Sequence, residues 1–346
     1  MPRPRALSYS GRMILAGDIG GTGSRFGLFE IRDDRPRPVA VEKYPSRGHV
    51  RLEDIVAKFL AAHPAKIRGA CFGIAGPVIG GEVVTPNLPW HIRAASLAEL
   101  LGLPQVSLIN DLEANAYGAA ALPDADFETL QKGTTDPEGN AGIISAGTGL
   151  GQAGFYFDGA RLRPFASEGG HVDFAPQSDL EIELLVHLRG KFGHVSYERV
   201  LSGPGLVNLF EFLRATGRGE ESPALAAELA AGISAGAIAA AGLDGTSSRA
   251  VQALDLFVSL YGAEAGNLAL KMKATRGVLI GGGIAPKLIA KLREPRFLAA
   301  FLDKGRMRPL LGQIPVRVIL NDQCALLGAA LFAALEADLV ADSPVA

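Results

Sequence analysis

The sequence predicts an α/β protein built from two domains with a cleft between them. A chain of 346 residues, 48% of them hydrophobic, has enough apolar surface for two separate cores. Residues 13–29 and 141–157 resemble each other, because each has a short apolar strand, a loop containing Gly-Thr-Gly and a second strand ending in aromatic residues. After each copy, short apolar strands alternate with helical segments, which favours largely parallel sheets.

The elements of the first half follow from the pattern of apolar residues. Residues 1–12 are basic, lack the apolar core of a secretory signal and are expected to form a flexible tail. After the first copy of the repeat, apolar residues recur at helical spacing. We expect a helix over Leu52–His63, strands at Ala70–Ile74 and Val106–Ile109, and a helix over Leu112–Leu122.

The second half continues the alternation after the second copy of the repeat. We expect helices over Leu180–Arg189, Ala224–Gly242, Ala250–Lys273 and Ala325–Leu335, and buried strands at Val278–Ile280 and Val316–Leu320. No Pro- or Ser-rich linker marks a boundary. We therefore place a smaller domain at residues 13–121 plus about 312–338, and a larger domain at residues 122–311.

Composition excludes several classes of partner. The 34 basic and 36 acidic residues give a net charge of −2, and without a basic run nucleic acid is not an expected partner. Cys71 and Cys324 form no CxxC pair, which fits a cytoplasmic protein and argues against a structural zinc site. The uncharged stretch Leu229–Leu243 is shorter than the roughly 20 residues of a membrane span, so we interpret it as a buried helix.

Two short motifs point to chemistry that their surroundings exclude. Gly149–Gly154 matches GxGxxG, but a dinucleotide site needs a helix after this loop, and here the aromatic strand Phe155–Phe157 follows. Gly232–Gly236 matches GxSxG, but all six histidines precede Ser234, whereas the hydrolase order places the histidine after the serine. We therefore expect neither a dehydrogenase nor a serine hydrolase.

The turn that follows the first strand is typical of a phosphate site. Consecutive Gly20 and Gly21 allow backbone N–H groups to point at a phosphate, and Thr22 adds a hydroxyl donor. Asp18, at the end of the strand, can hold Mg²⁺ through water. An ordinary hairpin that needs glycine only for its turn explains the same residues.

Two later glycine loops favour the phosphate interpretation. Gly147, Thr148 and Gly149 form the corresponding loop of the second copy, so two loops can hold the phosphates of one nucleotide from two sides. The loop Gly281–Gly283 follows a buried strand and offers flat backbone to an adenine or a ribose. A turn at the start of a helix is the alternative for this third loop.

Acidic and polar residues gather at strand ends and turns. Asn110 and Asp111 lie where a strand ends and a helix begins, which suits either a helix N-cap or a general base at the carboxyl end of the strand. Glu168 and His171 share a tight Gly-Gly turn, and Glu198 is expected in the first turn of a helix, where a surface acid is the alternative. Several polar acceptors beside one base suit a polyol.

These motifs together resemble the bacterial glucokinases, which belong to the hexokinase–actin class of ATP-binding proteins. The resemblance covers roughly residues 13–335 and includes, in this order, D-x-G-G-T, I-N-D, A-G-T-G-L-G, E-G-G-H-V-D-F-A-P, E-R-V-L-S-G-P-G-L-V-N and G-G-G-I. The two long blocks are specific, whereas the first and last pieces occur in many sugar kinases. The zinc-binding cysteine motif of the related repressor, open-reading-frame and kinase family is absent from the sequence.

The resemblance implies a two-domain actin/hexokinase-like, ribonuclease H-like fold with an interdomain cleft. It implies a glycolytic enzyme that transfers a phosphoryl group from Mg²⁺-bound ATP to the 6-hydroxyl of glucose, in the cytoplasm and as a homodimer. By the same resemblance, the base is Asp111; the sugar residues are Asn87, Asn110, Glu168, His171 and Glu198; the phosphate loops contain Gly20, Gly21, Thr22, Gly147, Thr148 and Gly149; the adenosine loop contains Gly282 and Gly283; and Asp18 holds the metal through water.

The sequence departs from the family pattern at three places. Gly23 stands where the family has Asn, and Leu112 stands where Phe commonly follows Asn-Asp. The family's Asn-His-Thr-Trp is Asn87-Leu88-Pro89-Trp90, so only the first and last residues match.

Three other functions share the fold class: a kinase for another hexose, a sugar sensor without activity, and an actin-like ATPase that needs no sugar.

Overall fold

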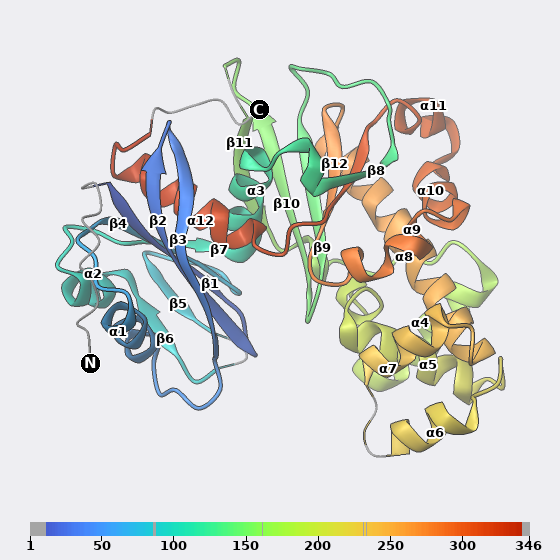
Figure 1. Ribbon diagram of the computed structural model, residues 1–346. Helices are drawn as coiled ribbons and strands as arrows, with labels where there is room; N and C mark the ends of the chain where they lie inside the picture. The colour runs from blue at the N-terminus through green and yellow to red at the C-terminus, as the bar shows by residue number, and fades with distance from the viewer. Residues whose placement is uncertain (1–11, 86–87, 161, 231, 233, 341–346) are drawn as a thin grey trace. The chain divides into compact units, whose positions relative to one another are not determined.

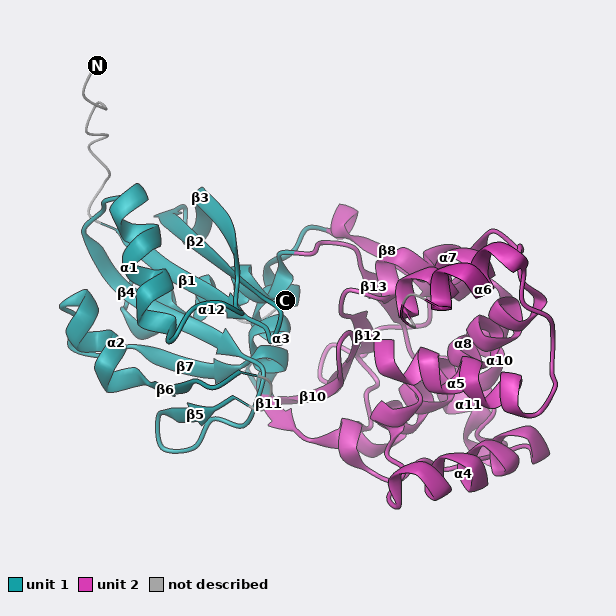
Figure 2. Cartoon of the chain, turned by 90° about the horizontal axis from the view of Figure 1, so that it is seen from below, with its two compact units in different colours: residues 1–123, 160–164, 323–346 teal, residues 124–159, 165–322 magenta. Residues whose placement is uncertain are grey.

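The computed structural model describes residues 12–85, 88–160, 162–230, 232 and 234–340. The chain forms two compact units, shown in separate colours in Figure 2: residues 1–123, 160–164 and 323–346, and residues 124–159 and 165–322. The final crossing between the units lies at Gln323, later than the expected position near residue 312. The reason is that Val316–Ile319 pairs with strands of the second unit.

The first unit is a five-stranded sheet with helices on both faces. The strands are β1 (Met13–Ile19), β2 (Gly23–Arg32), β3 (Arg35–Pro45), β4 (Ile67–Ile74) and β7 (Ser107–Asn110), in the order β3-β2-β1-β4-β7. β1 pairs antiparallel with β2 and parallel with β4, which pairs parallel with β7. The helices are α1 (Leu52–Ala62), α2 (Ala94–Leu101), α3 (Asp111–Ala121) and α12 (Cys324–Glu336), and β5 (Glu82–Val84) and β6 (His91–Arg93) form a separate ribbon.

Alternation along β1 explains the two layers of helices. Met13 and Leu15 belong to the core with α1 and α2, whereas Ile14 and Ala16 belong to the core with α3 and α12. Successive side chains of a strand point to opposite faces, so a strand covered on both faces has apolar residues throughout. This explains why the strand has no polar alternation in the sequence.

The second unit repeats the same sheet order with one added strand. The strands are β8 (Phe127–Gln131), β9 (Ala141–Ala146), β10 (Leu150–Phe157), β11 (Leu162–Ser167), β12 (Gly277–Gly281) and β13 (Val316–Ile319), in the order β11-β10-β9-β12-β13-β8. Figure 1 labels the strands from β8 to β12. β9 pairs antiparallel with β10 and parallel with β12, as β1 does with β2 and β4. The expected repeat is therefore confirmed, and the GxGxxG segment runs into strand β10 and not into a helix, as expected.

Helices form most of the rest of this unit. They are α4 (Asp179–Phe192), α5 (Gly203–Ala215), α6 (Pro223–Ala230), α7 (Ala235–Leu243), α8 (Ser248–Met272), α9 (Ile289–Leu292), α10 (Pro295–Leu302) and α11 (Arg308–Leu311), with short 3-10 turns η1 (Asp124–Asp126), η2 (Gly169–His171), η3 (Tyr197–Arg199), η4 (Ala285–Leu288) and η5 (Gly305–Met307). The long helix α8 contacts β9, β10 and β12 and carries many residues of the core. No helix within the described ranges is long and apolar enough to cross a membrane.

The prediction of one continuous helix over Ala224–Gly242 is wrong. The structure has two helices there, α6 and α7, because the helical conformation of the backbone is interrupted between them. Gly232 has φ +147°, which an α-helix does not allow, and Ser234 caps the next helix by accepting a hydrogen bond from Ala237 N. The stretch Leu229–Leu243 is therefore not one continuous helix.

Candidate active site

In the first unit, the turn between β1 and β2 is held by a neighbouring serine. Gly20 N donates to Gly23 O at 3.1 Å, and Ser46 Oγ donates to Gly20 O at 2.7 Å. Ser46 N donates to Thr22 O at 3.2 Å. Thr22 is exposed, whereas Asp18 at the end of β1 is half-buried. A fixed turn therefore presents the Thr22 hydroxyl to its surroundings.

Asn110 and Asp111 lie at the carboxyl end of β7. Asn110 caps α3, because its Oδ1 accepts from Leu112 N at 2.8 Å, and its Nδ2 donates to Gly76 O at 3.1 Å. The N-cap interpretation is therefore confirmed. Asp111 is the first residue of the helix and is half-buried. Strands β1 and β7 both run parallel to β4, which lies between them, so Asp18 and Asp111 both lie at the carboxyl end of these strands.

In the second unit, the corresponding loop is bonded to distant segments. Gly147 N donates to Gly149 O at 2.8 Å, and Gly203 N at the start of α5 donates to Gly147 O at 2.8 Å. Glu198 in η3 accepts a hydrogen bond from Leu150 N at 3.0 Å through Oε2. Glu198 therefore lies against the glycine loop in a single 3-10 turn, which corrects the expectation of a helix.

Glu168, His171 and Glu198 come from two turns that are joined to each other. Glu168 precedes η2, and its Oε2 lies 4.0 Å from His171 Nε2, with both side chains more than half exposed. Tyr197 N donates to Val172 O at 3.0 Å, which connects η3 to the end of η2. The structure thus brings these three predicted residues into one region of the second unit, while Asn87 lies outside the described residues.

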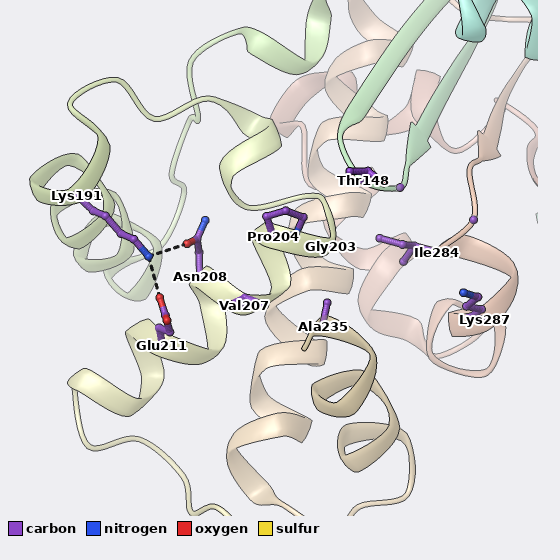
Figure 3. Close-up of a pocket in the computed structure, with 12 residues that line it drawn as sticks. Thr148, Lys191, Gly203, Pro204, Val207, Asn208, Glu211, Ala235, Ile284 and Lys287 are labelled. Carbon is purple, nitrogen blue, oxygen red and sulfur yellow. Dashed lines mark hydrogen bonds and ion pairs between the residues drawn. The ribbon is translucent and has the colours of Figure 1, made fainter. Parts of the chain in front are cut away.

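A cavity of about 830 Å³ borders the second glycine loop (Figure 3). Its size suits a nucleotide, since ligand pockets span about 300–1,000 Å³. Twelve residues line it: Gly147, Thr148, Lys191, Gly203, Pro204, Val207, Asn208, Glu211, Ala235, Gly283, Ile284 and Lys287. Two of the predicted glycine loops therefore open into one cavity within one unit.

Four polar residues that line this cavity were not predicted as site residues: Lys191, Asn208, Glu211 and Lys287, of which Lys191 contacts both Asn208 and Glu211. Lys191 Nζ lies 2.8 Å from Glu211 Oε2 and 3.3 Å from Asn208 Oδ1, and Figure 3 shows the three together on the other side of the pocket from Ile284. Asn208 ends the specific block that begins at Glu198, so its motif was visible in the sequence. Lys191 and Glu211 belong to different helices, and no sequence pattern connects them.

Gly282 is required where the third glycine loop leaves β12. Its φ is +83°, a region that L-residues other than glycine rarely adopt. A Cβ built on Gly282 would lie 2.3 Å from Ala146 O, whereas one on Gly283 would meet nothing within 4 Å. The close approach places the Gly283 backbone at the cavity and beside the end of β9.

The donors present fit a magnesium ion that arrives with a nucleotide. Among the described residues there is no group of three His, Cys, Asp or Glu side chains able to hold a metal. Mg²⁺ commonly binds through one or two carboxylates, waters and substrate phosphates, so a single carboxylate such as Asp18 is sufficient. Asp173, which follows the Gly-Gly-His turn, instead pairs with His194 at 2.8 Å.

Comparisons with known proteins find similar chains over nearly the whole length of this one. A glucokinase of Nostoc sp. is 44% identical over 341 residues, covering 93% of this chain and 99% of the relative. The crystal structure of a glucokinase from an Antarctic psychrotroph matches with a TM-score of 0.80 and 32% identity, covering 93% of this chain and 98% of that one. A glucokinase of the ROK family from Streptomyces griseus, solved with glucose and AMPPNP, has the same fold at a TM-score of 0.67 and 22% identity, with coverage of 93% and 99%.

The expected two-domain hexokinase-like fold is therefore confirmed. The family profile described as glucokinase matches residues 15–336. Since that match and the relatives extend over nearly the whole chain, the chain belongs to the glucokinase family.

Proposed function

We propose that this chain transfers the γ-phosphoryl group of ATP to the 6-hydroxyl of glucose, with Asp111 as the general base. Membership of the glucokinase family supports the reaction. The structural observation that supports it most is the bond from Leu150 N, directly after the second glycine loop, to the Glu198 carboxylate. This bond joins a loop of the nucleotide cavity to a residue of the proposed sugar site.

Asp111 is suited to accept the proton of the attacking hydroxyl. A carboxylate at the carboxyl end of a parallel strand faces the side on which α/β sheets bind ligands. Asn110 holds the first turn of α3 in place through its cap, which fixes the backbone of Asp111. Asp111 takes the proton as the sugar oxygen attacks the γ-phosphorus, while the bond from that phosphorus to the β–γ bridging oxygen breaks and ADP leaves.

The three glycine loops bind the nucleotide in this proposal. The turn that contains Gly20, Gly21 and Thr22 contacts the phosphates from one side, through the backbone N–H groups of Gly21 and Thr22 and the Thr22 hydroxyl. Gly147, Thr148 and Gly149 contact them from the other. Gly282 and Gly283 form the floor for the adenosine.

Magnesium enters the proposal with ATP, held through water by Asp18. When bound, this ion neutralises charge on the phosphate oxygens in the transition state. The cavity also contains Lys191 and Lys287, which lie outside the glycine loops. The second unit therefore contributes two cationic side chains at its cavity, of which Lys191 is paired with Glu211.

Glucose is held by the polar residues of the joined turns. Glu168, His171 and Glu198 accept and donate hydrogen bonds to the sugar hydroxyls, together with Asn110 and Asn87. Each hydroxyl needs a partner once water is removed, and this set supplies both donors and acceptors. The proposal also includes a homodimer and a role in glycolysis in the cytoplasm.

A coupled assay of ADP release tests the reaction. The purified protein is given MgATP with and without glucose, and then with mannose, fructose or an N-acetylated sugar. We expect ADP release to depend on glucose and to be slower with the other sugars. Release that is independent of sugar would indicate an actin-like ATPase, binding of glucose without release would indicate a sensor, and a faster reaction with another hexose would change the substrate.

A further inference from the structure

Helix α8 carries two fully buried polar side chains one helical turn apart. Tyr261 and Glu264 are both 0% exposed, although α8 lies in the core of the second unit. Burying a polar group is costly unless it has hydrogen-bond partners, and a buried carboxylate needs several. The hydrogen-bond partners of Tyr261 and Glu264 therefore identify the segments that α8 fixes in position.

Tyr261 holds the two loops that open into the nucleotide cavity. Its hydroxyl accepts from Ala146 N at 3.2 Å, directly before the Gly147–Gly149 loop. It lies within donating distance of Gly281 O at 3.2 Å, directly before Gly282, and of Ile144 O at 3.3 Å in β9. Burial raises the pKa of this hydroxyl, so it keeps its proton and remains a donor. One side chain thus bridges the ends of β9 and β12, where the two strands separate into loops.

Glu264 points into a separate network of buried polar groups. Its Oε1 accepts from Gln152 Nε2 at 2.8 Å, and its Oε2 accepts from Asn267 Nδ2 at 2.8 Å. Lys271 Nζ lies 3.3 Å from Oε1. A carboxylate accepts hydrogen bonds only, and these three donors fix the position of the Glu264 side chain.

The network ends at the two turns that carry the sugar residues. A Cβ on Gly169 would lie 2.4 Å from Gln152 Oε1, so the Gln152 side chain packs directly beneath the turn after Glu168. Asn267 Nδ2 also donates to the Tyr197 hydroxyl at 3.0 Å, and Tyr197 precedes Glu198. Gln152 and Tyr197 are 1% and 2% exposed, so neither can move without disturbing the core.

We propose that α8 positions the two substrate sites separately, with Glu264 as a positioning residue for the sugar turns and Tyr261 as a positioning residue for the nucleotide loops. Neither residue contacts a substrate in this account. Glu264 acts through Gln152 on Glu168 and through Tyr197 on Glu198. The inference rests on the proposed function, because it takes the two turns as the sugar site and the cavity as the nucleotide site.

The test compares Glu264→Gln with Tyr261→Phe in the full-length enzyme. In Glu264→Gln, an NH₂ group, which only donates, replaces one of the two carboxylate oxygens that accept from Gln152 and Asn267. One of these two donors therefore loses its acceptor. We expect the KM for glucose to rise about 10-fold or more, while the KM for ATP changes less than about 2-fold. In Tyr261→Phe we expect the reverse, with the larger rise in the KM for ATP.

A rescue separates positioning from general loss of stability. The double variant Glu264→Gln with Gln152→Glu restores a donor and acceptor pair at the same place, and we expect it to recover most of the KM for glucose. Val258→Ala, also buried on α8, is the control for a weakened core and is expected to leave both KM values within about 2-fold. If Glu264→Gln does not fold, Tyr197→Phe provides the second test, with a smaller rise in the KM for glucose only.

The possible outcomes are distinguishable. Equal rises in the KM for glucose and the KM for ATP would overturn the inference, and so would an unchanged KM for glucose in Glu264→Gln or Tyr197→Phe. The proposed function would remain intact in these cases as long as the wild type phosphorylates glucose. A wild-type protein that does not phosphorylate glucose would instead contradict the proposed function itself. A double variant no better than Glu264→Gln would overturn the coupling of Glu264 to Gln152.

Discussion

The two units use the same strand order around their glycine loops but hold those loops differently. The sheets β3-β2-β1-β4-β7 and β11-β10-β9-β12-β13 correspond strand by strand. In the first unit, the loop between β1 and β2 is held by Ser46, the residue directly after β3, through hydrogen bonds to Gly20 O and Thr22 O. In the second unit, the loop is bonded to α5 through Gly203, to η3 through Glu198 and to α8 through Tyr261.

This difference explains how one motif serves two purposes. In the proposed function the first loop contacts the phosphates, and the carboxyl ends of the strands in its sheet supply the carboxylates of Asp18 and Asp111. The second loop is connected to helices that also carry the cavity and the sugar turns. Changes at Asp111 should therefore affect the chemical step, and changes at the attachments of the second loop should affect substrate binding.

The largest effect is expected at Asp111. Asp111→Ala should lower kcat by about 10² to 10⁴, because the attacking hydroxyl loses its base, while the Kd for glucose stays within a few fold. Steady-state kinetics and calorimetric titration with glucose measure the two quantities. Glu113→Gln, two residues along the same helix, is the matched control and should leave kcat nearly unchanged. A kcat close to that of the wild type in Asp111→Ala would remove this residue from the role.

Gly282→Ala is expected to weaken nucleotide binding. A Cβ at φ +83° and 2.3 Å from Ala146 O must displace the loop, so the KM for ATP should rise about 10-fold with little change in the KM for glucose. Gly147→Ala sharpens the comparison, because its Cβ meets nothing within 4 Å in the free protein. A rise in the KM for ATP without a lower Tm in that variant would report contact with the nucleotide itself. Unchanged ATP kinetics in both variants would contradict the placement of the nucleotide.

Ser46→Ala tests the simpler attachment of the first loop. Ser46 is buried, and its Oγ lies 2.9 Å from the buried Ser24 Oγ as well as bonding Gly20 O. Removing it leaves both groups without this partner and should lower the free energy of unfolding by about 1–2 kcal/mol. Urea denaturation measures the change. We expect the loops of the second unit to contribute more to ATP binding than the first loop. A larger rise in the KM for ATP in Ser46→Ala than in Gly282→Ala would contradict this order.

The smallest effect concerns the pH dependence of stability. Burial raises the pKa of Glu113 above its ordinary value of about 4.3, so the folded state binds this proton more tightly than the unfolded state. The contribution of Glu113 to stability is therefore greatest below pH 4.3 and is lost as the pH rises through the higher pKa of the folded state. Glu113→Gln should be more stable than the wild type at pH 7, and the difference should shrink toward pH 4 in urea denaturation. A constant difference across this range would show that titration is not the cause.

The sequence predicts the parts of this fold that are encoded by local patterns. The two copies of the repeat, the strands after them and helix α8 appear as buried apolar runs or as residues at helical spacing. The N-cap of Asn110 is equally local. The break between α6 and α7 was also encoded, since Gly232 and Ser234 are a helix breaker and a favoured cap, but an alanine-rich background hid them.

Other features depend on contacts that no local pattern contains. Strand β3 has three prolines and several charges, and it forms because its partner β2 supplies a pairing edge. The bond from Leu150 to Glu198 spans 48 residues, and the bond from Gln152 to Glu264 spans 112. The sequence therefore predicts the identity of the site residues through their motifs, whereas the network that holds them is visible only in the folded chain.

The most direct test of the account measures both products of one reaction. The wild-type protein is incubated with MgATP and glucose, and the amounts of ADP and of glucose 6-phosphate are determined in the same sample. The account predicts equal amounts of the two products and almost no ADP when glucose is omitted. ADP in clear excess over the sugar phosphate, or ADP formed at the same rate without sugar, would contradict it.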